Sequence, residues 1–123
     1  EDYYRLSRHY FHDLFDSGIT LLDIIHCPHH PDAVLEKYRA SCFCRKPGPG
    51  MLLQAISKYS VDVEKSILVG DKVSDMEAAV NAGIKNCFLV ESGHKISQED
   101  YVKYSVFKSL YEVSIDQEIV NKL

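Results

Sequence analysis

Apolar residues recur along the chain with two periods, which together predict an α/β domain. Three- and four-residue spacing predicts helices over 2–17, 51–59, 74–82 and about 109–121. Compact apolar runs predict strands over 19–25, 66–70 and 85–90, with another near 104–107. Gly18 and Gly83 suit the ends of the helices before them, and Ser74 suits an N-cap. The periodicity disappears from 26 to 50, and the exposed stretch 94–100 leads to the strand near 104–107.

This order of elements predicts a mostly parallel sheet joined by right-handed crossovers. Ligands of such sheets bind beyond the carboxyl ends of the strands, which here means just after Ile25, Gly70 and Val90. The chain has 123 residues, 46% of them apolar, so we expect one core. The formal charge of −4 and the lack of a Lys/Arg run argue against nucleic-acid binding. No apolar run would span a membrane, and the charged N-terminus is not a signal peptide, so we expect a cytoplasmic protein.

Cysteine and histidine gather in the aperiodic stretch. Three thiolates and one imidazole would complete a closed tetrahedral zinc site, which is typical of a structural metal. The proposed ligands are Cys27, His29, Cys42 and Cys44. Zinc would hold a long loop that has little else to order it, and without an export signal metal binding is favoured over disulfides.

The same cluster allows other interpretations. The thiols could be free and lie near histidines by chance, and His30 or, more weakly, His26 could replace His29 as the imidazole ligand. Both of these histidines are more simply solvated side chains or satisfied core groups. Cys87 lies in an apolar strand pattern and is most simply a small core residue.

Charged residues follow two of the predicted elements closely. Arg45 and Lys46 come directly after the last proposed zinc ligand, where they could contact phosphate, although such a pair is usually solvated surface. Asp71 follows the strand 66–70 and could hold Mg²⁺, with Lys72 near a phosphate and Asp75 at the start of the next helix. The alternative is that Gly-Asp forms a turn and that Asp75 favours a helix N-terminus.

Together these residues resemble the haloacid dehalogenase-like (HAD) phosphatases. The resemblance rests on CPHHP at 27–31, CFCRKPGPGMLLQA at 42–55 and SILVGDKVSDMEAAVNAG at 66–83. Within the family these motifs are most similar to those of the bacterial heptose 1,7-bisphosphate phosphatases. The histidinol-phosphate phosphatases share a zinc loop, but theirs is shorter. The resemblance implies that 1–123 is the C-terminal part of one HAD-like domain, with a zinc-binding loop at 26–47.

The resemblance also implies a role for each matching residue. Zinc is bound by the four residues proposed above, Arg45 recognises substrate, and Lys46 stabilises the transferring phosphoryl group. Asp71 and Lys72 lie at the magnesium, Lys72 also at the substrate, and Asp75 supports this loop. The implied reaction is Mg²⁺-dependent removal of the C7 phosphate of D-glycero-D-manno-heptose 1,7-bisphosphate, on the route to lipopolysaccharide heptose precursors.

One family feature is missing from this sequence. HAD phosphatases use a D-x-D motif, whose first Asp is the nucleophile and whose second is the general acid/base. The chain has no D-x-D ahead of Cys27, where the acidic residues are Glu1, Asp2, Asp13, Asp16 and Asp23. The resemblance therefore implies an incomplete sheet without its first two strands. We expect the chain alone to be inactive, to be unstable as an isolated sheet and to need the missing segment or another chain. The alternatives are a histidinol-phosphate phosphatase or a non-catalytic zinc-binding fragment.

Overall fold

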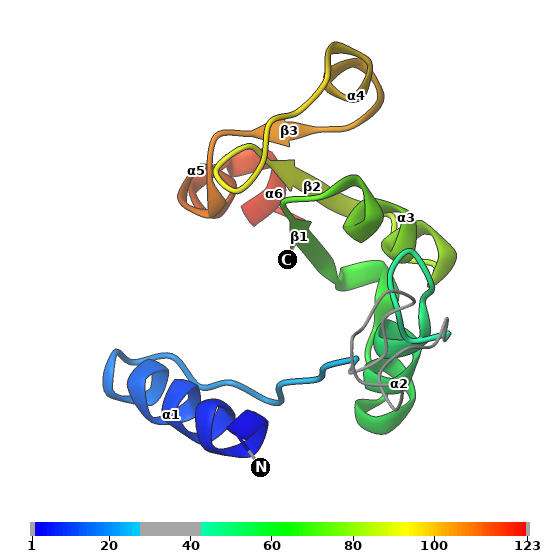
Figure 1. The fold of residues 1–123 in the computed structure, drawn as a ribbon. Coiled ribbons are helices and arrows are strands. Elements are labelled where there is room, and N and C mark those ends of the chain that lie inside the picture. Colours follow the sequence, from blue (N-terminus) through cyan, green and yellow to red (C-terminus); the bar gives the residue numbers. More distant parts are fainter. Residues whose placement is uncertain (1, 28–42, 123) are drawn as a thin grey trace.

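The computed structural model describes residues 2–27 and 43–122 (Figure 1). His29, His30 and Cys42 of the proposed zinc loop lie outside these ranges. The described part begins with helix α1 (Asp2–Asp16), which ends at Gly18 in the left-handed conformation with φ of 86°. Helix α2 (Gly50–Tyr59) follows the loop, with Pro49 at its N-cap. Both helices lie where the apolar spacing predicts them.

A three-stranded parallel sheet forms the centre of the fold. Its strands are β1 (Ile67–Gly70), β2 (Asn86–Val90) and β3 (Val106–Phe107), in the order β1-β2-β3. Val69 pairs with Phe88, and Leu89 pairs with Val106. The parallel sheet is therefore confirmed. Within the described ranges β1 has β2 as its only strand neighbour, so its other edge is unpaired.

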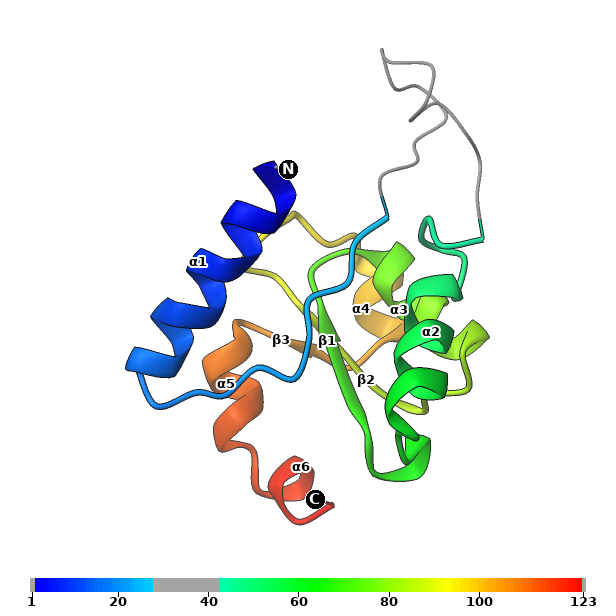
Figure 2. The same cartoon turned by 90° about the horizontal axis from the view of Figure 1, so that it is seen from below.

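Helices cover both faces of this sheet (Figure 2). Helix α3 (Val73–Asn81) packs against β1 and β2 on one face and buries Met76 completely. Helices α5 (Leu110–Ile115) and α6 (Gln117–Val120) lie on the other face. There Phe88 packs with residues of the sheet and the two helices, namely Val90, Val113, Ile119 and Phe107. Side chains alternate along a strand, so Leu89 points to the α3 face and is fully buried.

The strand predicted over 19–25 does not form, and this prediction is wrong. Residues 19–27 run without regular structure, and no described strand pairs with them to complete a ladder. A strand is defined by its pairing, so an apolar run without a neighbour stays extended but unassigned. Figure 1 shows α1 and this segment lying apart from the sheet. Their apolar side chains, such as those of Phe15 and Leu22, are largely exposed.

Three other predictions need correction, each because of a helix cap. Helix α3 begins one residue early, with Lys72 and not Ser74 at its N-cap. Helix α4 (Gln98–Lys103) forms from the exposed stretch, where no helix was predicted, and Ser97 caps it by accepting a hydrogen bond from the backbone N–H of Asp100. The single closing helix is two short ones, because extended Asp116 ends α5 and caps α6 by accepting from Ile119.

Candidate active site

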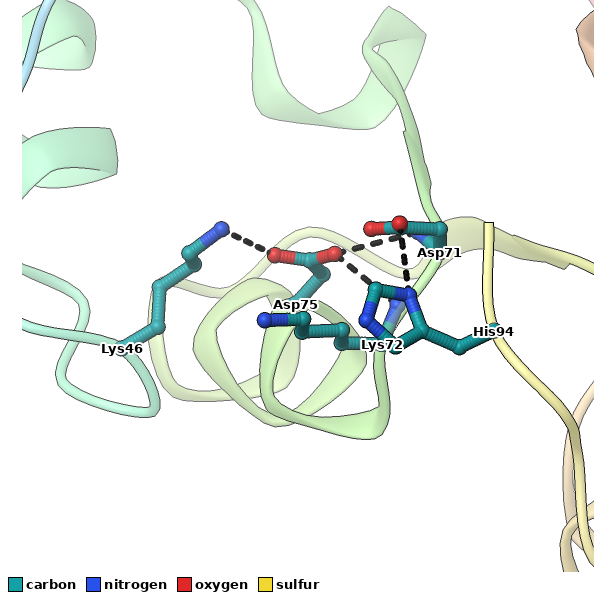
Figure 3. Close-up of polar contacts among 5 residues, drawn as sticks. All are labelled: Lys46, Asp71, Lys72, Asp75 and His94. Carbon is teal, nitrogen blue, oxygen red and sulfur yellow. Dashed lines mark hydrogen bonds and ion pairs between the residues drawn. The ribbon is translucent and has the colours of Figure 1, made fainter. Parts of the chain in front are cut away.

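Four polar side chains meet at the carboxyl end of β1. They form a row that runs from Lys46 in the loop before α2, through Asp75 on α3 and Asp71 after β1, to His94 after β2 (Figure 3). Asp71 and His94 both follow strands whose carboxyl ends lie at the same edge of the sheet. This edge is where the sequence analysis predicts a ligand site.

Asp75 links the row together. Its side chain is only 10% exposed. Its Oδ2 accepts hydrogen bonds from the backbone N–H groups of Asp71 and Lys72, both at 3.1 Å. Its Oδ1 accepts from the Lys46 ammonium in a short ion pair. Gly70 allows this arrangement, since a Cβ at that position would lie 2.4 Å from the Asp75 Cβ.

The loop that carries Lys46 is a tight turn. The backbone N–H groups of Gly48 and Gly50 donate to the carbonyls of Arg45 and Phe43, at 2.8 and 2.9 Å. A Cβ on either glycine would lie within 2.6 Å of the Phe43 carbonyl oxygen, so larger residues do not fit. Asn81 of α3 also donates to the carbonyl of Pro47 at 3.1 Å. These contacts hold Lys46 against α3, while the Arg45 side chain is exposed beside it.

Two of the four proposed zinc ligands are neighbours. Cys27 and Cys44 are joined in a disulfide, with their Cα atoms 5.7 Å apart. The other two, His29 and Cys42, lie outside the described residues. Within the described ranges no group of three or more His, Cys, Asp or Glu side chains is arranged to hold a metal. The zinc site therefore remains a prediction, while the proximity of Cys27 and Cys44 is compatible with a shared metal.

Asp71 fits the role of a magnesium ligand in part. Its side chain is 41% exposed, and its Oδ2 lies 2.9 Å from Nδ1 of His94. No described residue hydrogen-bonds to its Oδ1, so that oxygen can meet a cation from solvent. One carboxylate does not complete the six-oxygen shell of Mg²⁺, so water, phosphate or other protein oxygens would supply the rest.

Lys72 is exposed at the N-cap of α3, one residue after Asp71. An ammonium group has no lone pair to offer a metal, so the Lys72 side chain suits a phosphate better than magnesium. His94 is the residue of this row that the sequence analysis did not identify. Its signal was its place shortly after a predicted strand, at the edge where ligands were expected.

A cavity of about 530 Å³ opens beside the row, between β1, α2 and the segment 19–27. Its walls are mainly apolar, and Lys46, Asp71 and Asp75 lie at its polar end. On the far wall Asp23 accepts a short hydrogen bond from the Tyr59 hydroxyl and one from Lys58 at 3.2 Å. These bonds, that of Tyr59 foremost, lower the pKa of Asp23. The contact ties the extended segment to α2.

A helix that crosses a membrane was not expected, and the part of the chain that the structure describes holds none of the required length and apolarity.

Comparisons with known proteins agree with this architecture. The HAD-hydrolase-like family model matches residues 43–113, which is more than half of the chain. A D-glycero-alpha-D-manno-heptose-1,7-bisphosphate 7-phosphatase of Photorhabdus laumondii is 50% identical over 98 residues, which are 80% of this chain and 54% of the relative. The D-glycero-beta-D-manno-heptose-1,7-bisphosphate 7-phosphatase of Escherichia coli K12 is 45% identical over 86 residues, 70% of this chain and 45% of that protein. The chain thus spans about half the length of these curated relatives.

Two solved structures share the fold. A D,D-heptose 1,7-bisphosphate phosphatase from B. bronchiseptica, complexed with magnesium and phosphate, superposes with a TM-score of 0.66 at 26% identity. That match covers 93% of this chain and 60% of the other. A HAD-like phosphatase from Mesorhizobium loti gives a TM-score of 0.68 at 25% identity, over 91% of this chain and 51% of that one. The family match over 43–113 and the shared fold establish that the chain belongs to the HAD-hydrolase-like family.

Proposed function

We propose that the protein carrying this chain is a Mg²⁺-dependent sugar-phosphate phosphatase. Its proposed substrate is D-glycero-D-manno-heptose 1,7-bisphosphate, which loses its C7 phosphate on the route to lipopolysaccharide heptose precursors. The observation that carries the proposal is the meeting of Lys46 and Asp71 at one buried carboxylate, Asp75, at the carboxyl end of β1. The printed activities of the Photorhabdus and Escherichia relatives support the substrate.

Each residue of the row has a part in the proposed reaction. Lys46 places a positive charge where phosphoryl oxygens gain charge, and Asp75 fixes that charge in position. Arg45 and Lys72 are exposed cations, one directly before Lys46 and the other directly after Asp71, and they recognise the substrate's phosphate groups. Asp71 holds the metal. When bound, Mg²⁺ would offset the negative charge of the phosphate, and the B. bronchiseptica protein is complexed with both magnesium and phosphate.

The nucleophile comes from a segment that this sequence does not contain. In the resembled family an Asp oxygen forms a bond to phosphorus as the bond to the sugar oxygen breaks, and a second Asp protonates that sugar oxygen. Water then releases phosphate from the aspartyl intermediate. The unpaired edge of β1 and the 530 Å³ cavity beside it suit an extended strand that carries these carboxylates toward Lys46 and Asp71. We therefore propose that the chain alone is inactive.

Intact mass of the purified protein tests this point. A denatured mass of 14.0 kDa, with no second polypeptide under native conditions, describes the chain alone. That species should release no phosphate, and turnover by it would contradict the proposed inactivity. A heavier native complex should contain a D-x-D segment and should be active.

The substrate is tested by phosphate release from both anomers of heptose 1,7-bisphosphate and from histidinol phosphate. The active species should prefer the heptose and stop when EDTA removes the metal. Lys46→Met and Asp71→Asn should each lower kcat at least a hundredfold, because the first removes a positive charge beside the phosphoryl group and the second weakens binding of the metal that offsets its negative charge. Lys65→Met is the matched control, since Lys65 is an exposed lysine that precedes β1, at the opposite end of this strand from Asp71. Equal loss in the control would contradict the assignment.

We also propose a structural zinc ion bound by Cys27, His29, Cys42 and Cys44. The proximity of Cys27 to Cys44 supports it, and a reducing environment would favour zinc over the disulfide. Protein purified with a reductant should contain one zinc per chain, and Cys44→Ser should lose it. A metal-free protein whose mass falls 2 Da below that of the reduced chain would favour the disulfide instead, because a disulfide lacks two hydrogens.

Two alternatives stay open. A histidinol-phosphate phosphatase would show the reverse substrate preference, and the long zinc loop argues against it. A non-catalytic zinc-binding fragment would bind zinc but release no phosphate even with a D-x-D segment present. The absence of D-x-D ahead of Cys27 is the observation that favours the second alternative.

A further inference from the structure

The loop between β2 and α4, residues 91–97, lies against the Asp71 carboxylate. His94 Nδ1 is 2.9 Å from Asp71 Oδ2 (Figure 3). A carboxylate oxygen accepts, so Nδ1 carries the hydrogen and donates it. The contact joins the segments that follow the neighbouring parallel strands β1 and β2.

Gly93 brings the loop backbone close to the same carboxylate. A Cβ at this position would lie 2.1 Å from Asp71 Oδ2 and 2.9 Å from its Cβ. No side chain fits there unless Asp71 moves. The loop therefore restricts the Asp71 carboxylate by packing as well as by the hydrogen bond from His94.

Both ends of this loop are fixed. The backbone N–H of Glu91 donates to the carbonyl of Phe107 at 3.0 Å, and the Tyr101 hydroxyl donates to the Glu91 carboxylate in a short hydrogen bond. At the other end the Ser97 hydroxyl caps α4 by accepting from the N–H of Asp100 at 3.2 Å. With both ends held, the position of the middle of the loop is set by the fold.

We propose that His94 is a positioning residue for the metal site. Gly93, which has no side chain, allows the loop that carries His94 to approach the Asp71 carboxylate. His94 occupies Oδ2 of Asp71, so Oδ1 would be the oxygen that meets the cation, in an orientation that the hydrogen bond restricts. Groups that hydrogen-bond to a metal ligand orient it in this way and strengthen metal binding. The inference rests on the proposed magnesium site at Asp71.

The competing interpretation is an ordinary surface pair. The His94 side chain is 51% exposed, and exposed pairs usually contribute little. An ordinary pair, however, does not require a glycine beside it. The two interpretations differ in what happens to metal affinity when the hydrogen bond is removed and when it is restored.

The test is Mn²⁺ binding to the purified protein, followed by calorimetry and by electron paramagnetic resonance, in five variants. His94→Ala should weaken Mn²⁺ binding roughly tenfold, within the range found for groups that orient metal ligands. His94→Asn should recover most of this loss, because its amide N–H can replace Nδ1–H. Gly93→Ala should weaken binding by displacing Asp71. His12→Ala is the matched control, an exposed histidine on α1, and should bind as the parent does.

The outcomes separate this inference from the proposed function. If Asp71→Asn abolishes binding while His94→Ala binds like the parent, the metal site stands and the positioning role is wrong. If Asp71→Asn also binds like the parent, or if the parent does not bind Mn²⁺, both are wrong. Equal loss in His94→Ala and His94→Asn would likewise overturn the hydrogen-bonding role. Thermal unfolding of His94→Ala should match the parent, which excludes a general loss of structure as the cause.

Discussion

Replacement of Asp75 by alanine should destabilise the fold strongly, because one nearly buried carboxylate satisfies three donors. The change removes two hydrogen bonds from backbone N–H groups, at 3.1 Å each, and the ion pair with Lys46. A hydrogen bond to a charged group contributes about 1.5–3 kcal/mol. The Lys46 side chain is 39% exposed, so the ion pair adds at most about 1 kcal/mol after solvent screening. The lower values apply because Asp71 and Lys72 lie near solvent.

The expected total is therefore about 3 kcal/mol of unfolding free energy. With a urea slope of about 1.5 kcal/mol/M, the midpoint should fall by roughly 2 M. Unfolding is followed by far-ultraviolet circular dichroism at pH 7. Asp75→Asn keeps one acceptor oxygen, but its NH₂ group then faces another donor, either the Lys46 ammonium or the backbone N–H groups. Its midpoint should therefore lie between those of the parent and Asp75→Ala.

Glu77→Ala is the matched control, since it removes an exposed carboxylate from the same helix. Its midpoint should stay close to the parent value. The reasoning would be refuted by a midpoint for Asp75→Ala within about 0.3 M of the parent, or by an equal loss in the control.

Three further predictions follow from other contacts. The lowered pKa of Asp23 means that its ion pair and hydrogen bonds stabilise the fold above the unfolded pKa near 3.9, and that this contribution is lost as the pH falls through the folded value. The difference in urea midpoint between the parent and Asp23→Asn should thus be present at pH 6 and shrink below about pH 4; a constant difference would contradict it. Burial raises the pKa of Cys87, so its thiol should react slowly with a disulfide reagent at pH 7.5 until urea unfolds the protein; fast native labelling would argue otherwise. Leu89→Ala should cost about 2–5 kcal/mol in the same urea assay, because the side chain is fully buried, with the exposed Leu110→Ala as control.

The sheet could be predicted from the sequence because its strands carry their own signals. Residues 67–70 and 86–90 are apolar runs bounded by turn residues, and their burial against helices on both faces is what a parallel strand requires. The segment 19–25 has the same signal but forms no strand, since pairing depends on a neighbour that the local sequence does not specify. Apolar content alone does not distinguish the two cases.

The sequence allowed most residues of the site to be predicted, but not the contacts between them. Asp71, Asp75 and Lys46 were identified individually from their place beside predicted elements. That Lys46 pairs with Asp75 could not be predicted, because the contact spans 29 positions and depends on how the loop before α2 packs on α3. His94 was missed for the same reason, since its partner Asp71 lies 23 positions earlier, after a different strand.

The sequential strand order has a consequence for folding. Each strand pairs with the next one along the chain, through partners about twenty positions apart, so β1, β2 and β3 can assemble by closing short loops. The contacts that complete the site close longer loops. The hydrogen bond of Tyr59 with Asp23, for example, joins residues 36 positions apart. The sheet should therefore acquire protection from hydrogen exchange before α2 and the segment 19–27 come together.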